Sequence, residues 1–600
     1  MTNTADCGAT DVLNFRVDLG GVIALLSRNL YSGPGVYVRE LIQNAMDAIV
    51  ARDALGGDPA PRTVTISPYG VASPDSSADE FTIEDSGVGI SLDQVGQFLA
   101  TVGASSKRDE LERDRRTYIG QFGIGLLSCF VVADRITVVS RSADGASPIE
   151  WVGGSDGTYK VRTLDEDRPV GTTVRLRPLP AMAGWVRAEQ VAPLAQKYAE
   201  FLPLAVRILT AEGPEMISTI YPWALGFESH RAGVRQGVSP VYGGLGVGKQ
   251  FDVIEVSDTS LGLEGVIYVG MPSTRTTSSG HNRVYINDML VTDTDGSLLP
   301  SWAFFGWAVV NSTTLEPTAS RESVKDDTAL ALTRERLGQA LLRWLRALAD
   351  TDPERFAGFV ALNHMELRRA ATLGAGPDSL QLAEVILPML TMETTDGPMR
   401  LLDVVARNPR ILYSPHTDEF RTIAGFAPRG RLILDAGHTL DQEVLQTLPQ
   451  VIPGVTVTRV YPASEVAALV SPAMDEAGEV HQLEQRAAQA LADQKCDVAA
   501  RLFPSADRPS IFITRGLLDL VSPGYGRSAH LVVNWNNRVV RALARLDDQV
   551  VFNRVIQLIY VQARMASGCD TTEDRALLSA ALDDLILVAV GITEIGESDG

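Results

Sequence analysis

The pattern of apolar and polar positions predicts a helix at residues 38–48, VRELIQNAMDA, which contains no Gly or Pro. At about 100° per residue, Glu40, Asn44 and Asp47 fall within a narrow arc that Gln43 flanks. The opposite side of this helix is apolar and comprises Leu41, Ile42, Ala45, Ala48 and Ile49. Taken alone, the line of polar groups fits a solvated helix face.

Strand-like segments follow this helix and end in turn residues. They lie at residues 63–70, 80–90, 135–142, 159–164 and 171–179. Because few of them are joined by a crossover helix, the pattern favours an α+β sandwich with a mixed or antiparallel sheet over a doubly wound fold. The pattern loosens around residues 209–220, which predicts a domain boundary.

The rest of the chain predicts further α+β regions. Residues 251–291 alternate as strands, and residues 329–350 form a long helix with apolar positions three and four apart. Residues 410–460 predict a smaller α/β unit. From about residue 482 the pattern is mostly helical.

The two last predicted helices, residues 550–565 and 575–591, carry more apolar surface than a small domain hides, which favours an oligomer interface. We therefore expect three domains, and each boundary is a prediction. They are an N-terminal domain at 1–210, a middle domain at 220–480 and a small, mostly helical C-terminal dimerisation domain at 481–600.

Composition narrows the class of protein. The 600 residues exceed what one core can hold, and the net charge of −21 disfavours surfaces for nucleic acid or anionic membranes. The four cysteines form no CxxC pair, so a disulfide framework or a zinc site is not expected. The first residues lack the pattern of a signal peptide, and no apolar run is long enough to span a membrane. We expect a cytoplasmic protein.

A carboxylate stands beside two glycines in IEDSGVGIS, residues 83–91. Asp85 ends a predicted strand, where it can accept a hydrogen bond from an amino group, and the glycines let backbone approach a flat ligand. An ordinary turn is the alternative for this motif alone.

A glycine-rich loop, YIGQFGIGLLS at residues 118–128, precedes a predicted helix in LLSCFVVA. Backbone N–H groups of such a loop can bind an anion, here around Gly120, Gly123 and Gly125. A packing loop is the alternative. The polar segment 98–117 between the two motifs suits a mobile lid or an exposed helix and loop.

Together with the strand GTTVRL, residues 171–176, these elements occur in an order that resembles the GHKL ATPases and their Bergerat-type nucleotide site. Residues 22–141 resemble the heat-shock-protein-90 family, especially the bacterial HtpG type. The likeness continues in residues 282–324, which resemble that family's middle domain, and more weakly in residues 531–590.

The resemblance assigns roles to residues of the N-terminal domain. Glu40 would be the general base, Asn44 would hold Mg²⁺, and Asp47 would lie near the sugar and base of ATP. Asp85 would accept from the adenine amino group. Near these groups, backbone and hydroxyl contacts to the nucleotide would come from Gly89, Thr172 and the three loop glycines.

Arg321 resembles the middle-domain arginine that reaches the γ-phosphate. An Arg321–Glu322 surface pair is the alternative. Thr318 and Lys325 depart from the family pattern, as do the lid sequence and Leu126-Leu127 after the glycine loop. The chain ends in GITEIGESDG without the MEEVD tail of other family members, which fits a bacterial-type member.

The resemblance implies an ATP-dependent chaperone that acts as a homodimer on unfolded or partly folded client proteins, without nucleic acid or membrane partners. A GHKL ATPase acting on DNA and a nucleotide-binding scaffold without turnover are the alternatives. The aromatic segment SWAFFGW, residues 301–307, is expected in the middle-domain core rather than on a client surface.

Overall fold

The computed structural model describes residues 33–56, 60–71, 78–99, 125–239, 250–270, 282–293, 296–318, 321–374, 377–514 and 529–590. The chain divides between Leu341 and Leu342 into two compact units. No helix in these ranges is long and apolar enough to cross a membrane.

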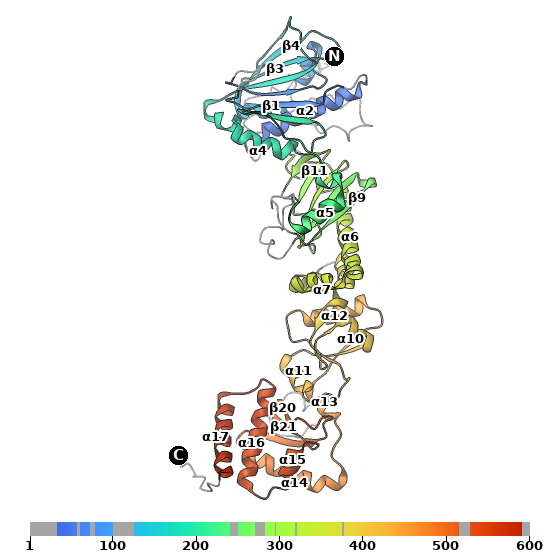
Figure 1. The fold of residues 1–600 in the computed structure, drawn as a ribbon, viewed down its shortest axis with the longest axis vertical. Coiled ribbons are helices and arrows are strands. Elements are labelled where there is room, and N and C mark those ends of the chain that lie inside the picture. Colours follow the sequence, from blue (N-terminus) through green and yellow to red (C-terminus); the bar gives the residue numbers. More distant parts are fainter. Residues whose placement is uncertain are drawn as a thin grey trace, which may run out of the picture. The chain divides into compact units, whose positions relative to one another are not determined.

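The first unit begins with an eight-stranded sheet (Figure 1). Its strands lie in the order β5-β4-β3-β6-β2-β1-β7-β8. All neighbouring strands are antiparallel except β1 and β7, which are parallel, so the predicted mixed sheet is confirmed. The strands are β1 (Thr63–Ser67), β2 (Phe81–Asp85), β3 (Ala133–Arg141), β4 (Ile149–Gly154), β5 (Tyr159–Thr163), β6 (Gly171–Pro178), β7 (Ala205–Thr210) and β8 (Gly213–Met216). The β7–β8 hairpin carries this sheet past the predicted end of the N-terminal domain at residue 210.

Helices α2 (Val36–Ala54) and α4 (Ala188–Ala199) pack together on one face of this sheet. Period-two alternation places Val64 and Ile66 of β1, for example, in the core with the apolar side of α2. Tyr37 of α2 meets Phe81 of β2 edge to face, with ring centroids 5.2 Å apart. The predicted first helix is confirmed. A short helix α3 (Val95–Phe98) follows β2 in the chain.

The helix predicted after the glycine loop is a short 3₁₀ helix, η2 (Gly125–Val131), and β3 begins at Ala133. The predicted helix is confirmed for residues 126–131, as a 3₁₀ helix, and it ends before Ala133. Val132 is β-branched and favours extended backbone, and pairing of β3 with β4 and β6 draws the chain into the sheet.

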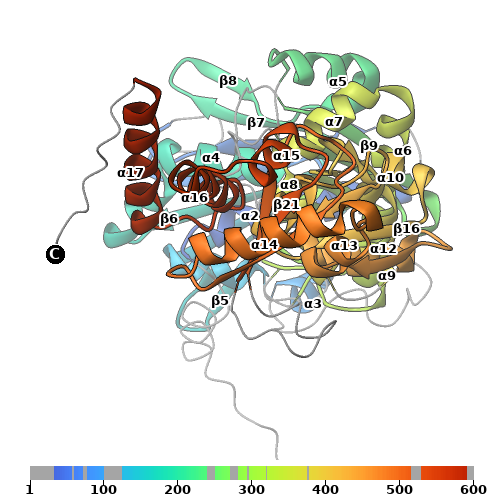
Figure 2. The same ribbon diagram turned by 90° about the horizontal axis from the view of Figure 1, so that it is seen from below.

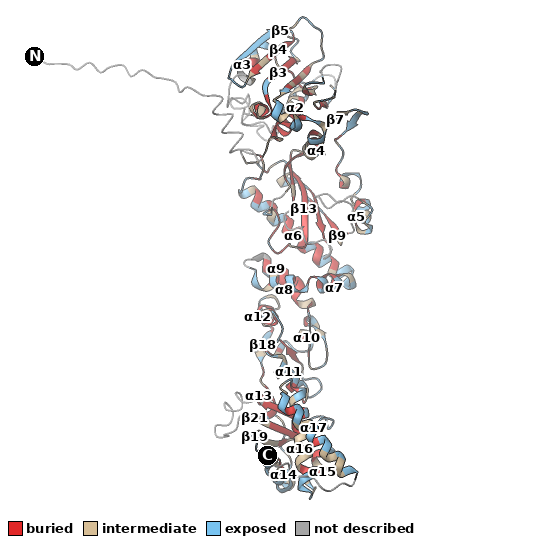
Figure 3. Cartoon of the chain, turned by 90° about the vertical axis from the view of Figure 1, so that its left-hand side faces the viewer, coloured by how far each residue is buried: buried red, intermediate tan, exposed pale blue. Residues whose placement is uncertain are grey.

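A five-stranded sheet follows in the same unit, in the order β12-β11-β13-β10-β9. Its strands are β9 (Asp252–Asp258), β10 (Leu263–Val269), β11 (Arg283–Ile286), β12 (Met289–Thr292) and β13 (Gly306–Ser312). Helix α5 (Phe227–Gln236) packs beside β9. The strands β9 and β13 are largely buried (Figure 3).

The aromatic segment 301–307 lies in the core, as expected. Trp302, Phe305 and Trp307 are buried, and Trp307 stacks on Tyr268 with ring centroids 5.4 Å apart. The long predicted helix is α6 (Thr328–Thr351), which runs across the division between the two units.

The second unit begins with helices α7 (Pro353–Leu362), α8 (His364–Leu373), α9 (Pro377–Ile386) and α10 (Leu401–Arg407), and includes the short hairpin β14 (Thr391–Met392) and β15 (Met399–Arg400). A parallel sheet in the order β17-β16-β18 forms the small α/β region predicted at 410–460. Its elements are β16 (Arg410–Ser414), α11 (Thr417–Ala424), β17 (Ile433–Asp435), α12 (Asp441–Val451) and β18 (Thr456–Arg459), followed by α13 (Pro462–Ala467).

In the described residues from 477 to 590, the sheet β19-β21-β20 is combined with four α-helices. These elements are α14 (Ala477–Ala490), β19 (Cys496–Arg501), β20 (Ser510–Thr514), β21 (Ala529–Asn534), α15 (Arg538–Ala544), α16 (Gln549–Ala566) and α17 (Thr572–Ala589). The last two helices lie side by side (Figure 2). Leu582 and Ile586 of α17 and the following Val590 are exposed. The expected fold class, α+β with a mostly helical end, is confirmed.

Candidate functional site

The polar line on α2 is not a uniform solvated face. Glu40 is only 3% exposed and Gln43 only 1%, whereas Asn44 is exposed and Asp47 is partly buried. One helix therefore presents a buried acid and, one turn later, an open amide. The alternative of a simple solvated face fails at Glu40, because this side chain is buried. A buried carboxylate needs a charged or hydrogen-bonding partner.

The partner of Glu40 is Arg321, which lies 281 positions later in the chain. Arg321 Nη1 donates to Glu40 Oε2 at 2.9 Å and also contacts Gln43 Oε1. Arg321 is itself buried, so the alternative of an Arg321–Glu322 surface pair does not describe this side chain. The structure brings together the two residues that the sequence proposed as catalytic.

Arg39 closes this cluster from the same helix. Its Nη2 lies 3.2 Å from Glu40 Oε1, and its Nη1 donates to the backbone carbonyl of Arg321 at 3.2 Å. Arg321 has a φ of +57°, a left-handed conformation that costs a non-glycine residue of order 1 kcal/mol or more. Contacts to both its backbone and its side chain hold Arg321 in that conformation.

The second part of the site lies where β2 ends. Asp85 is opposite Thr172 of β6, and its Oδ1 accepts from the Gly87 N–H at 2.8 Å. The Thr172 hydroxyl lies 2.9 Å from Ser140 Oγ, which itself donates to the Gly171 carbonyl. Asp85 and Thr172 share the parity of Ile83 and Val174, so both belong to the helix-covered side of the sheet.

Loss of hydration raises the pKa of Asp85 to about 7, against the opposing effect of the backbone hydrogen bonds from Gly87 and Thr172. A carboxyl group with a pKa near neutrality, in a recess at a strand end, is typical of a functional site. Neutral and ionised forms of Asp85 are both accessible near pH 7.

The loop after Asp85 is fastened to α2, which joins the two parts of the site. Val88 N–H donates to the Ala48 carbonyl at 2.9 Å, and Arg52 Nη1 donates to the Ser86 carbonyl at 2.7 Å. Gly87 lies so close to α2 that an added Cβ would be 2.4 Å from the Ala48 Cβ. Asp85 is therefore held beside the helix that carries Glu40 and Asn44.

The described glycines of the site have different roles. Gly89 has a φ of +71°, and a Cβ there would lie 1.9 Å from the Arg141 carbonyl oxygen, so Gly89 shapes the loop. A Cβ on Gly125 would lie 2.8 Å from Glu40 Oε2 and 3.7 Å from Asn44 Nδ2. Gly125 thus leaves space beside the acid and the amide. Gly120, Gly123 and nearly all of the predicted lid lie outside the described residues.

Sequence reasoning missed three contributors to the site. Gln43 was visible at the edge of the polar line, and Arg39 is the neighbour of Glu40 in sequence, but periodicity does not reveal which of them meets Arg321. Ser140 gave no signal, because its position depends on the pairing of β3 with β6.

The geometry defines an α+β domain with an acid-bearing helix, a strand-end aspartate and an arginine from a later segment. The family of histidine kinase-, DNA gyrase B- and HSP90-like ATPases matches residues 31–167. Among curated proteins, the chain is 28% identical over 379 residues to the chaperone protein HtpG of Mesorhizobium japonicum, covering 59% of each chain. It is 26% identical over 370 residues to the mitochondrial TNF receptor-associated protein 1 homolog of Dictyostelium discoideum, covering 59% of this chain and 51% of the relative.

Residues 31–167 thus belong to an ATPase domain of the histidine kinase-, DNA gyrase B- and HSP90-like kind. The chain is similar to curated HtpG chaperones, at 28% to 29% identity over 57% to 59% of its length for three of them. It spans about three fifths of the length of the HtpG relatives it matches, at 59% for Mesorhizobium japonicum and 57% for Rhizobium meliloti.

Proposed function

We propose that this protein is an ATP-dependent molecular chaperone that hydrolyses ATP to ADP and phosphate. The observation that carries the proposal is the buried meeting of Glu40 and Arg321 at 2.9 Å. A carboxylate that can take a proton from water and a guanidinium that can stabilise phosphate charge are the two groups that this hydrolysis needs. They come from segments 281 positions apart, so turnover depends on how these segments meet.

Arg321 exchanges partners in the proposed cycle. In the present arrangement its Nη1 donates to Glu40 and contacts Gln43. With ATP bound, the guanidinium would turn toward the γ-phosphate, which frees the Glu40 carboxylate to accept the proton of the attacking water. Gln43, which now accepts a hydrogen bond from Arg321, would remain beside Glu40 as a hydrogen-bonding group after Arg321 has turned away.

The residues present fit adenine and a phosphate chain. Asp85 offers its carboxylate to the exocyclic amine of adenine, and the Thr172 hydroxyl lies opposite on β6. Gly125 lacks the side chain that would fill the space beside Glu40 and Asn44, where the phosphates would lie. Backbone N–H groups near Gly125 would donate to phosphate oxygens, together with those of Gly120 and Gly123. Asp47 would face the sugar.

Asn44 would hold Mg²⁺, because its amide is exposed one turn beyond Glu40 and oxygen ligands suit this cation. Among the described residues no cluster of three or more His, Cys, Asp or Glu could hold a metal ion, which agrees with a cation held chiefly by phosphate oxygens and water. When bound, Mg²⁺ would neutralise charge that develops on the phosphates.

We further propose that the protein acts as a homodimer in the cytoplasm on unfolded or partly folded clients. The exposed apolar side chains Leu582, Ile586 and Val590 at α17 support a self-association surface. The three domain boundaries predicted from the sequence remain part of this proposal. A change in the Glu40–Arg321 contact during each turnover would then couple ATP to opening and closing of a clamp.

The test measures steady-state ATP hydrolysis and nucleotide affinity in parallel for the wild type, Glu40→Ala and Asp85→Asn. We expect Glu40→Ala to bind ATP without turnover and Asp85→Asn to lose binding. Hydrolysis at the wild-type rate by Glu40→Ala would exclude Glu40 as the base. Suppression of aggregation of a heat-denatured client, with and without ATP, tests the chaperone activity separately.

A further inference from the structure

The face of the eight-stranded sheet turned away from α2 is rich in arginine. On β6, Val174 and Leu176 belong to the core with α2, so Thr173, Arg175 and Arg177 point to the other side. Strand register places further residues of this outer face beside them. Its charged members are Arg135, Arg141, Lys160, Arg162, Arg175, Arg177 and Arg207, with Glu84 and Glu150.

The net charge of this outer face is positive, whereas the net charge of the whole chain is negative. Seven cations against two carboxylates on the strands give a net of five positive charges, and the neighbouring acids Asp79, Asp134 and Asp167 lower this to two, in a protein whose formal charge is −21. Arg141 pairs with Asp167, and Arg162 pairs with Glu150. The other five cations form no ion pair with a described carboxylate, and Arg175 Nε is buried without a hydrogen-bond partner among the described residues.

Arginines in neighbouring strands of this face repel each other, which lowers the stability of the sheet when no partner is bound. Arg135 of β3 lies directly opposite Arg177 of β6, and like charges in this register are destabilising. Such a pair of like charges adds no stability to the free protein. A partner that brings negative charge would relieve the repulsion and occupy the unpaired guanidinium groups.

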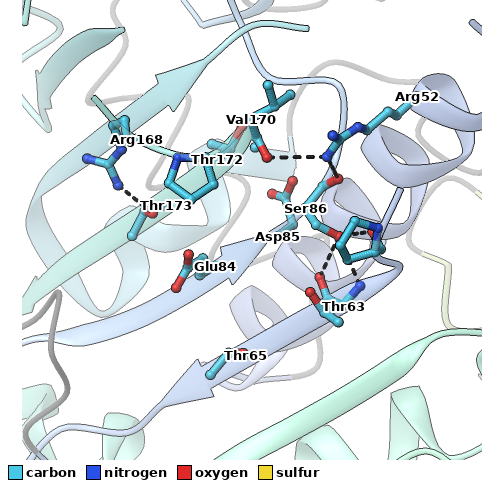
Figure 4. A pocket seen from close by; sticks show the side chains of 13 residues that line it. Arg52, Thr63, Thr65, Glu84, Asp85, Ser86, Arg168, Val170, Thr172 and Thr173 are labelled. Atoms are coloured by element: carbon cyan, nitrogen blue, oxygen red, sulfur yellow. Dashed lines mark hydrogen bonds between the residues drawn. The ribbon is translucent and has the colours of Figure 1, made fainter. Parts of the chain in front are cut away.

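Two hollows mark the ends of this basic surface. One of about 270 Å³ lies at the start of β6 and is lined by Glu84 and Thr173 of this face, by Asp85 and Thr172 of the candidate site, and by Arg52 and Arg168 (Figure 4). The other, of about 550 Å³, is lined by Arg135 and Arg177 together with Tyr69, Asp79 and Asp134. The five residues of β6 from Thr173 to Arg177 span roughly 13 Å.

We propose that the outer face binds an extended acidic segment of a partner polypeptide. Side chains two residues apart on an extended chain are about 7 Å apart, so alternate carboxylates match the spacing of Arg175 and Arg177. The acids Glu84, Asp79 and Asp134 in the hollows would repel a continuous phosphate backbone, but they can accept hydrogen bonds from a peptide. A polypeptide of alternating character therefore fits better than a nucleic acid.

The binding is independent of the proposed ATPase activity. The arginines to be tested, Arg175 and Arg177, lie across the sheet from α2, and neither is among the residues proposed for turnover. The Glu40→Ala variant should therefore bind the acidic segment as the wild type does. Failure of ATP hydrolysis would leave this proposal standing, and failure of peptide binding would leave the ATPase proposal standing.

The test uses a fluorescein-labelled ten-residue peptide in which Glu alternates with Thr, followed by fluorescence anisotropy on the full-length protein. We expect saturable binding that weakens as salt rises. Arg175→Glu combined with Arg177→Glu should weaken binding at least about tenfold. Replacing both arginines with Lys keeps the charge and should keep binding within about threefold.

The matched control is Arg343→Glu combined with Arg369→Glu, which changes the net charge equally at exposed arginines of α6 and α8. This control should bind within about twofold of the wild type. Urea unfolding verifies that each variant is folded, and Arg175→Gln with Arg177→Gln replaces the reversal if the latter unfolds. No saturable binding, equal loss in the control, or tighter binding of a ten-nucleotide single-stranded DNA would overturn the proposal.

Discussion

Glu40 Oε2 and Arg321 Nη1 lie 2.9 Å apart in a buried contact that joins the first helix to a segment after the second sheet. Removing Glu40 or Arg321 would take an ion-pair partner from a buried charge, and only Arg39 or Gln43 would remain to compensate it. The contact therefore links the fold of the first unit to the chemistry proposed for it.

Replacing Arg321 with Ala should abolish most ATP turnover. The lost guanidinium removes stabilisation of phosphate charge, for which we expect at least about a 100-fold fall in kcat with a smaller change in nucleotide affinity. Single-turnover and steady-state hydrolysis measure this. Lys325→Ala is the control, since Lys325 pairs with Glu316 at the surface and should change kcat by less than about twofold. An equal fall in both variants would point to general disturbance of the segment.

Stability should fall as pH rises from about 4 to 7 because of Asp85. Its pKa is raised from 3.8 to about 7 in the folded protein by loss of hydration, so the folded state binds the extra proton across this window. The full shift corresponds to about 4 kcal/mol, and the remaining exposure of the side chain reduces this to roughly 2 kcal/mol. Urea unfolding at pH 5 and pH 8 should show this contribution in the wild type and not in Asp85→Asn. An identical pH dependence in the two proteins would contradict the assignment.

Gly89 should tolerate no side chain. A Cβ at this position would lie 1.9 Å from the Arg141 carbonyl oxygen, in a backbone with φ of +71°. Gly89→Ala should destabilise the protein by about 3 kcal/mol or more, because the clash adds to the backbone strain. Gly70 has a φ of +95°, but a Cβ added there would meet nothing within 4 Å, so Gly70→Ala should cost only about 1 kcal/mol. Urea unfolding compares the two, and equal losses would show that conformation alone matters.

Much of the first unit was predictable because its signals are local. Helix α2, the strand that ends at Asp85 and the buried aromatic residues around Trp307 all follow from periodicity and propensity. The 3₁₀ form and the early end of the helix after Gly125 were not predictable in this way, since they depend on the pairing of β3 with β6. Resemblance, rather than periodicity, singled out Arg321. Its left-handed backbone and its contact with Gln43 depend on tertiary packing that no local pattern encodes.

The arginine-rich outer face also could not be predicted from local sequence patterns alone. In the sequence, the strand at 171–176 stands out for its hydroxyl groups, and the alternation of Arg175 and Arg177 with apolar residues is visible. A single strand does not tell which side meets a helix. Only the register with β3 places Arg135 opposite Arg177 and makes the arginines one surface.

Asn44 separates a role in binding from a role in stability. Its side chain is exposed on α2, so Asn44→Ala should change the free energy of unfolding by no more than about 0.5 kcal/mol. If its amide oxygen holds Mg²⁺ beside the phosphates, the same variant should bind ATP at least about tenfold more weakly in Mg²⁺ and equally in excess chelator. Titration calorimetry with and without Mg²⁺ measures both affinities. Asp53→Ala, at an exposed position near the end of the same helix, should match the wild type under both conditions. If Asn44→Ala keeps the full effect of Mg²⁺ on ATP affinity, the cation is held by other ligands. Of Glu40 and Asn44 on α2, only Glu40 would then have a role in turnover.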